Sequence, residues 1–307
     1  MFNSLKEIMD KCEHENKEFW QIILEDDMTD RNVDKKESVA KMKELWEAMY
    51  HASVNYDGSI RSSSGLSGGD GDKMEQYIKT QECLCGEFTG KVIVEALKMG
   101  ESNACMKRIV AAPTAGACGV LPAILVPYYE RMIKGDISDT QNARNENEES
   151  AKKEAEDQII KALYIAAGIG QVIALRASIS GAKGGCQAEI GSASAMAAGA
   201  LTYLQGGNEK KIVNSAAMAL KNMLGLVCDP VAGLVEVPCV KRNVAGAVNA
   251  VASSQMASAG IESRIPADEV IDAMAYVGDK MDESLRETGI GGLAGTPSGK
   301  EIARQVL

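Results

Sequence analysis

Apolar positions along this chain recur at the spacing of helices, and the alternation that strands require is nearly absent. Two charged segments near the N-terminus, from Phe2 to about Glu25 and from about Asp34 to His51, each carry one apolar stripe. Each stripe predicts an amphipathic helix, because a surface helix buries one face and leaves the other in water. We expect the two helices to lie antiparallel as an N-terminal helical flap, residues 1–53.

The rest of the chain, residues 54–307, is expected to form a single large helical domain. Apolar and alanine-rich runs predict its helices, and glycine-rich stretches predict the loops between them. Residues 135–149 are polar, have no apolar periodicity and are expected to form a loop. The fold class is therefore predicted to be all-α, with glycine-rich loops converging on one site. The expected helices cover about 74–98, a short segment ending at Tyr129, 151–178, 193–204, 209–226, 243–259 and 266–286.

Composition and charge narrow the classes of function. The chain has 30 glycines and only 4% aromatic residues, which predicts an interior of small side chains in close contact. A net charge of −10 argues against nucleic acid or an anionic membrane surface as partner and favours a small-molecule substrate. The longest apolar run, 162–175, is too short to span a membrane. Eight cysteines without a disulfide framework, and no signal peptide, predict a reducing cytoplasm.

Three cysteines lie in stretches that predict loops. Cys186 follows a glycine-rich run, 181–185, where the backbone can turn tightly and approach a bound group, and Cys228 and Cys239 lie in separate segments downstream. This pattern does not fit zinc, because structural zinc sites usually combine closely spaced cysteine pairs and four ligands. Iron–sulfur clusters are also held by thiolates, and a four-iron cluster with three protein thiolates keeps one iron open as a Lewis acid.

At these residues the sequence resembles the α subunit of the iron–sulfur-dependent L-serine dehydratases. The resemblance extends from about Val54 to the C-terminus, and its motifs occur in one order. They read SSSGLSGGDGDKM from residue 62, PTAGACGVLPAIL from 113, SGAKGGCQAEIGSASAMAAGAL from 180, GLVCDPVAGLVEVPCVKRN from 225 and ETGIGGLAGTPSGKEI from 287.

The resemblance implies a cofactor and a reaction. Cys186, Cys228 and Cys239 are expected to hold a [4Fe-4S] cluster, and the enzyme is expected to convert L-serine to pyruvate and ammonia. Loss of the hydroxyl group would be assisted by the open iron, and the enamine product would then hydrolyse. The cluster would make the enzyme sensitive to oxygen.

Two segments are predicted to bind the substrate. Both combine small hydroxyl side chains with glycine ahead of a predicted helix, where free backbone N–H groups and the helix dipole stabilise a carboxylate. The predicted substrate-binding residues are Ser62, Ser63, Ser64, Gly65, Thr114, Ala115 and Gly116.

The reaction also needs a general base to remove the α-proton, and the glycine-rich core contains no histidine. Lys183 lies three residues before Cys186, and desolvation would lower its pKa. It can equally serve only to offset the charge of the cluster. Glu189 and Asp229 are weaker candidates.

A separate β subunit is expected as partner. Single-chain members of the resembled family carry an additional domain before this region, and two-subunit members supply that domain as a β subunit. A third possibility for the base is therefore a side chain, such as a histidine, from this partner.

Three alternative functions remain open from sequence alone. A pyridoxal-phosphate lyase would use Lys183 for the Schiff base and residues 62–71 for the phosphate, but would leave the three cysteines unexplained. A non-catalytic iron–sulfur interaction module would use the cluster for structure. A related lyase would act on cysteine or threonine.

Other cysteines and both histidines are interpreted as structural. Cys83 and Cys85 are expected on a helix, where a C-x-C pair points to different faces, and to be buried as small hydrophobic side chains. Cys118 is expected to pack in the core, with a fourth cluster ligand as the alternative. His14 and His51 are expected at the surface or at helix caps.

Overall fold

Helices make up the regular structure of residues 1–135 and 148–307, the parts of the chain that the computed structural model describes. Within those parts no extended strand occurs, and an isolated bridge joins Cys228 to Arg286. The predicted all-α class is confirmed. The helices are α1 (Leu5–Glu15), α2 (Phe19–Arg31), α3 (Lys35–Val54), α4 (Asp70–Thr80), α5 (Gly86–Ala104), α6 (Val120–Ile133), α7 (Glu148–Arg176), α8 (Gly181–Gly184), α9 (Ser192–Leu204), α10 (Glu209–Asn222), α11 (Cys239–Ser258), α12 (Ala267–Lys280) and α13 (Pro297–Val306), with a π-helical turn (Gln187–Gly191) and two 3₁₀ turns (Val231–Gly233 and Glu283–Leu285).

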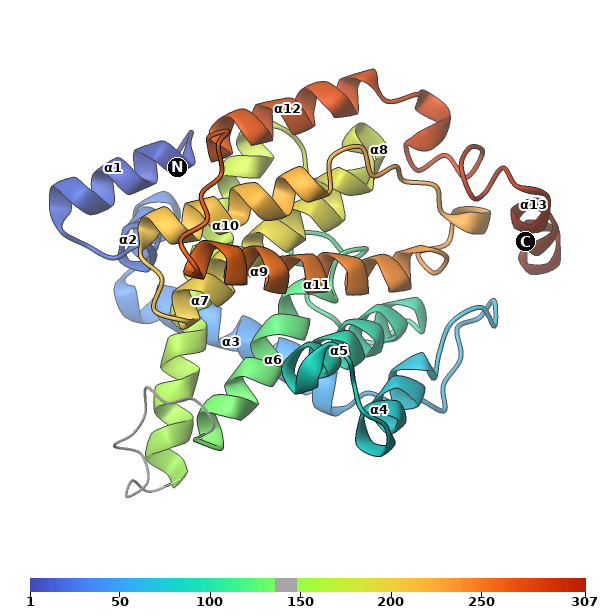
Figure 1. Cartoon of the computed structure of the whole chain (residues 1–307), viewed down its shortest axis with the longest axis horizontal. Coiled ribbons are helices and arrows are strands. Elements are labelled where there is room, and N and C mark those ends of the chain that lie inside the picture. Colours follow the sequence, from blue (N-terminus) through green and yellow to red (C-terminus); the bar gives the residue numbers. More distant parts are fainter. Residues whose placement is uncertain (136–147) are drawn as a thin grey trace.

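The core is organised around α9, which packs against α7, α10 and α11. Figure 1 shows α9 and α11 in the middle of the molecule, between α12 on one side and α4 and α5 on the other. Every α9 residue from Ser192 to Thr202 is buried. Small side chains are required here: a Cβ on Gly199 would lie 2.3 Å from Cδ1 of Ile169. The high alanine and glycine content therefore reflects close helix packing.

The first N-terminal prediction is wrong in one respect, because the single helix expected from Phe2 to Glu25 is two helices. Helix α1 ends at Glu15, and the next residue, Asn16, adopts the left-handed conformation (φ 51°). Asparagine accepts that conformation more readily than most residues and so ends helices. Glu18 then begins α2 with a capping box. The second expected helix is confirmed as α3.

Helices α1 and α2 pack closely on the rest of the chain. Leu5, Ile8 and Ile22 lie in the same buried cluster as Ile165 and Ile169 of α7. The apolar stripes predicted from the sequence are thus the buried faces of these helices. The division of the chain into a flap, 1–53, and a domain, 54–307, stays a prediction.

The helix expected over residues 74–98 also proves to be two helices. Helix α4 ends at Thr80 and α5 begins at Gly86, whose φ of +77° favours glycine. Cys83 and Cys85 lie in the connection between the two helices. Cys83 is half-buried and Cys85 is exposed, so the prediction that both are buried on a helix is wrong.

The remaining boundaries differ by a few residues. Helix α11 begins at Cys239, directly after Pro238, and α12 ends at Lys280. Cys239 is therefore the first residue of a helix, and Cys186 lies between the short helix α8 and the π-helical turn, whereas both cysteines were expected in loops. Of the segment expected as a loop, 135–149, residues 136–147 lie outside the described parts of the chain.

The apolar run 162–175 lies in α7, and the expectation that it is too short to span a membrane is wrong by length, because it is part of a longer helix. Among the described residues α7 is the one helix long and apolar enough to cross a membrane, and 67% of its most apolar window is buried inside the protein. It contacts α2, α6 and α9. This burial is consistent with a soluble protein.

Candidate active site and metal site

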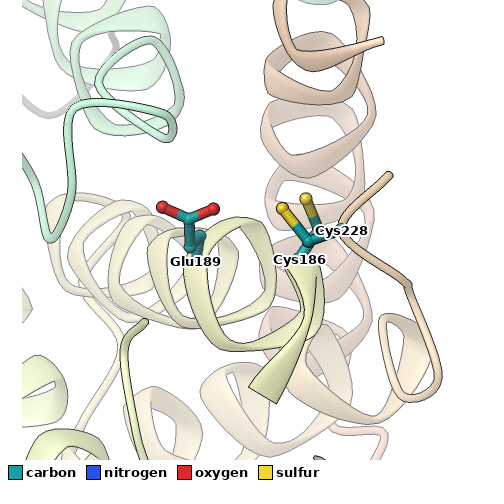
Figure 2. Close-up of side chains that lie close together, drawn as sticks. All are labelled: Cys186, Glu189 and Cys228. Carbon is teal, nitrogen blue, oxygen red and sulfur yellow. The ribbon is translucent and has the colours of Figure 1, made fainter. Parts of the chain in front are cut away.

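The structure brings two of the three predicted cysteine ligands, Cys186 and Cys228, close together, and Cys239 is not part of that group. All three thiols are buried. Cys186 follows α8, Cys228 follows α10, and Cys239 begins α11; their exposed fractions are 3%, 3% and 8%. The Sγ atoms of Cys186 and Cys228 and a carboxylate oxygen of Glu189 all lie within 4.8 Å of one another. Figure 2 shows the two sulfur atoms side by side, with the carboxylate of Glu189 next to them. These three groups are close enough to share a metal ion.

Gln187 holds the first two cysteine segments together. It is fully buried, its backbone N–H donates to the carbonyl oxygen of Leu226 (2.9 Å), and its Oε1 accepts from the N–H of Gly225 (2.9 Å). Its Nε2 donates to the carbonyl oxygen of Met274 on α12 (3.0 Å). The segment before Cys228 is thereby fixed against the segment after Cys186.

A cation lies beside the thiols. Nη1 of Arg242, on α11, lies 3.6 Å from Sγ of Cys186 and donates to the carbonyl oxygen of Val227 (2.8 Å). Nη2 forms an ion pair with the buried carboxylate of Asp229 (2.8 Å). An arginine in this position stabilises thiolate and offsets the negative charge of any thiolate-bound metal group.

The thiols differ in their acidity. The hydrogen bond with Cys228 lowers the pKa of Cys186; burial opposes this shift and the charge of Arg242 reinforces it. The same hydrogen bond, together with burial, raises the pKa of Cys228. Burial raises the pKa of Cys239 to about 12. Because metals bind the thiolate, binding here releases protons from these thiols.

Glu189 lies on the π-helical turn after Cys186, and such turns are frequent at functional sites. Its Oε1 accepts a hydrogen bond from Oγ1 of Thr114 (2.7 Å). Burial raises the pKa of this carboxyl group, and the Thr114 hydrogen bond partly offsets that rise. The arrangement brings a half-buried carboxylate, a hydroxyl group and two thiols together, and such groups can bind a ligand and transfer a proton.

Gly181 leaves the space in which Glu189 and Cys228 approach each other. A Cβ on Gly181 would lie 2.7 Å from Oε2 of Glu189 and 3.1 Å from Sγ of Cys228.

We expect Gly181→Ala to lower the iron retained by the anaerobically purified chain by about tenfold, as displaced supporting groups do at metal sites. Iron analysis and circular dichroism measure this, with Ala182→Ser as the exposed control. An unchanged iron content in Gly181→Ala would contradict the assignment.

The predicted segment 114–116 lies at this site. Thr114 and Gly116 are half-buried beside Glu189, and a Cβ on Gly116 would lie 3.2 Å from Oε1 of Glu189. Ala115 is exposed, and its carbonyl oxygen accepts from Asn103 (3.1 Å). The structure therefore brings this segment together with Cys186 and Cys228.

Asn243 joins that segment to Cys239. Its buried side chain donates to the carbonyl oxygens of Gly116 (2.8 Å) and Cys239 (3.0 Å) and accepts from the N–H of Gly119 (2.8 Å). All three bonds satisfy backbone groups next to the site. Sequence analysis missed this residue.

We expect Asn243→Ala to lower the free energy of unfolding by about 3 kcal/mol, because it leaves buried backbone groups without partners. Urea denaturation measures the change. Gln255→Ala, at an exposed position of the same helix, is the control and should change the free energy of unfolding by no more than about 0.5 kcal/mol. Equal effects of the two variants would show that the Asn243 bonds contribute no net stability.

The predicted serine segment is tied to the segment before Cys239. Ser62 and Ser64 donate to the carboxylate of Glu236, at 2.6 and 2.9 Å. Ser63 and Gly65 are exposed. Glu236 is buried and lies shortly before Cys239, so it links the serine segment to the third thiol.

Lys183 has a different environment. It is exposed and lines a cavity of about 160 Å³ with Gln187, Met274 and Asp279. None of the three cysteines lines that cavity. The role of Lys183 as general base stays a prediction.

Asp229, a candidate base, and Cys118, a candidate fourth cluster ligand, both have partners in the structure. The carboxylate of Asp229 pairs with Arg242 and accepts from the N–H of Leu293 (2.7 Å). Cys118 is buried and donates to the carbonyl oxygen of Met99 (3.6 Å), and burial raises its pKa to about 12. Cys118 is thus packed in the core as expected.

Sequence analysis missed Arg242, Asn243 and Glu236. Each is a charged or amide side chain in the segment 236–243, within four residues of Cys239 in sequence. Such a side chain at a predicted buried position signals a specific partner, because an unpaired polar group there is costly. That signal does not say which group is the partner.

Comparisons with known proteins agree on one family. The family model for the serine dehydratase alpha chain matches residues 14–294. The probable L-serine dehydratase alpha chain of Bacillus subtilis (strain 168) is 41% identical over 307 residues, which cover 100% of this chain and 96% of the relative. The L-serine dehydratase alpha chain of Peptoniphilus asaccharolyticus is 38% identical, covering 100% and 99%. L-serine dehydratase TdcG of Escherichia coli (strain K12) is 33% identical, covering 95% of this chain and 61% of the relative.

Proposed function

The chain belongs to the serine dehydratase alpha chain family, and from this premise we propose how its own residues carry out the reaction. It is a lyase that converts L-serine to pyruvate and ammonia. The observation that carries the assignment of the site is the approach of Cys228, from a separate segment downstream, to Cys186 and Glu189, with the three ligand atoms within 4.8 Å of one another.

We propose that the cofactor is a [4Fe-4S] cluster held by Cys186, Cys228 and Cys239. The donor set fits such a group: all three thiols are buried, two are in contact, and the guanidinium of Arg242 lies beside them to offset negative charge. When bound, the cluster would supply Lewis acidity to assist departure of the substrate hydroxyl group.

We propose that Thr114, Ala115 and Gly116 form one wall of the substrate site. Thr114 reaches the carboxylate of Glu189, and Gly116 leaves the space beside it. The segment precedes α6, so its backbone N–H groups suit a substrate carboxylate. The second wall is proposed at Ser62, Ser63, Ser64 and Gly65, which Glu236 holds against the segment of Cys239.

For the proton, we propose Glu189 as the acceptor, with Lys183 as the alternative. Glu189 is the carboxylate beside the thiols, and Thr114 occupies its Oε1, so Oε2 is the oxygen that faces Gly181 and Cys228. A base has to lie within hydrogen-bond reach of the proton that it removes. The exposed position of Lys183 in a different cavity favours Glu189.

We also propose a separate β subunit as partner. Relatives whose names specify an alpha chain match this chain over nearly their whole length, whereas TdcG, named without a subunit, is matched over 61% of its length. In relatives such as TdcG, the additional segment would perform the role that a separate β subunit performs for this chain. Eight cysteines outside any disulfide support a reducing compartment, and we propose the cytoplasm.

Pyruvate formation by the anaerobically purified chain, alone and with a β-like partner, tests the substrate. L-Serine is expected to give the highest kcat/KM, and L-threonine and L-cysteine are the competitors. A higher kcat/KM for either competitor would reassign the substrate while leaving the reaction type in place. No pyruvate or ketoacid from any of the three would favour a non-catalytic module.

A further inference from the structure

A second pair of cysteines lies far from the metal site, in the connection between α4 and α5. The Sγ atoms of Cys83 and Cys85 are 3.3 Å apart and share a hydrogen bond. Cys85 is exposed, Cys83 is half-buried, and Leu84 between them is 96% exposed. Figure 1 shows α4 and α5 on the side of the molecule opposite α12, whereas α8, which precedes Cys186, lies near α12.

We propose that Cys83 and Cys85 form a redox-reversible dithiol–disulfide pair that exchanges with small-molecule disulfides of the glutathione type. Exposure of Cys85 makes its sulfur the accessible nucleophile, since exchange requires the attacking thiolate to reach the reagent. Cys83, already in contact, is the resolving thiol. The short loop between α4 and α5 thus keeps the two sulfur atoms close enough to form a disulfide once Cys85 has reacted.

The exchange takes place in two steps, in which atoms and electrons balance. The Cys85 thiolate attacks one sulfur of the small-molecule disulfide, forms a mixed disulfide and releases one small thiolate, which takes up a proton. The Cys83 thiolate then attacks the Cys85 sulfur, forms the Cys83–Cys85 bond and releases the second small thiol. The two cysteines lose two electrons and two protons, and the small disulfide gains them.

The surroundings of Cys83 fit this chemistry. A Cβ on Gly90 would lie 3.1 Å from Sγ of Cys83, so glycine at this position of α5 leaves space for the sulfur to move. Cys83 also lines a cavity of about 520 Å³ with ion-paired side chains that include Lys79, Lys91 and Glu87. A cavity bordered by both charges suits a zwitterionic thiol compound.

The remaining cysteines lack these features. Cys12 and Cys118 are buried, and Cys105 is half-buried. Cys186, Cys228 and Cys239 belong to the metal site described above. Among the eight, Cys83 and Cys85 are the pair that combines mutual contact with exposure.

Peptide mapping of the anaerobically purified holoenzyme tests the proposal. The protein is reduced, exposed to oxidised glutathione, alkylated and digested with trypsin. Cleavage after Lys79 and Lys91 gives peptide 80–91, which contains Cys83 and Cys85 alone, and cleavage after Lys98 and Lys107 gives the control peptide with Cys105. We expect peptide 80–91 to lose two hydrogens and both alkylation sites, and to regain them with dithiothreitol. The Cys105 peptide should stay alkylated.

Two single variants test the order of the steps. Cys83→Ser should retain one glutathionyl group on Cys85, because no resolving thiol is present. Cys85→Ser should react at least about tenfold more slowly, because the remaining thiol is less exposed. The proposal is overturned if peptide 80–91 of the wild type keeps both alkylation sites, or if Cys85 is found joined to a cysteine other than Cys83.

Discussion

Replacement of Cys228 by serine is expected to remove the bound iron and to lower pyruvate formation from L-serine by about a hundredfold or more. Serine has nearly the size of cysteine but supplies no thiolate for a cluster. The helical core around α9 does not depend on this sulfur, so the circular dichroism spectrum should stay that of the wild type. Iron analysis, the pyruvate assay and the spectrum are measured on one anaerobic preparation.

The control is Cys118→Ser, another buried cysteine, whose sulfur bonds to the carbonyl oxygen of Met99. A serine hydroxyl can make the same bond, and iron and activity should both be retained. If Cys228→Ser unfolds the chain, the cluster is structural and the non-catalytic module is favoured. If Cys118→Ser loses iron while Cys228→Ser keeps it, the proposed ligand set is wrong.

Replacement of Glu189 by glutamine is expected to lower kcat about a thousandfold while iron is retained, because a proton acceptor contributes roughly that much to an elimination. Glutamine keeps the shape of the side chain and can still accept the hydrogen bond from Thr114. A change confined to kcat separates a missing proton acceptor from weaker substrate binding, which would appear mainly in KM.

Lys183→Ala is the matched comparison for Glu189→Gln. Lys183 is exposed in a cavity that the cysteines do not line, so kcat should stay within about twofold of the wild type. The reverse outcome, a large loss in Lys183→Ala and none in Glu189→Gln, would return the base to the lysine. Retained activity in both variants would point to a side chain of the β subunit.

The helical class and much of the site were predictable from the sequence because they depend on local patterns. The spacing of apolar residues predicted α3 and α7. The glycine-rich run before Cys186 indicated a segment of the site, and the structure places Cys186 close to Cys228. Helix breaks were harder to predict. Asn16 and Gly86 end or begin helices through left-handed backbone conformations, and the apolar spacing continues past both positions.

Partners across the fold could not be predicted, because they depend on tertiary contacts. Asn243 bonds to Gly116 and Gly119, far away in sequence, and Arg242 reaches both Cys186 and Asp229. The proximity of Cys83 to Cys85 was also missed, since a C-x-C pair on a helix separates its sulfurs, whereas the loop brings them to 3.3 Å.

The most direct test of the account is one assay of the anaerobically purified chain, with and without a β-like partner, for iron, acid-labile sulfide and pyruvate formation from L-serine. The account predicts about four irons and four sulfides per chain, as the cluster type requires, and activity that is lost on brief exposure to air. Activity that survives air and iron chelation but disappears with borohydride would contradict it, and would indicate a Schiff-base lysine in place of the cluster.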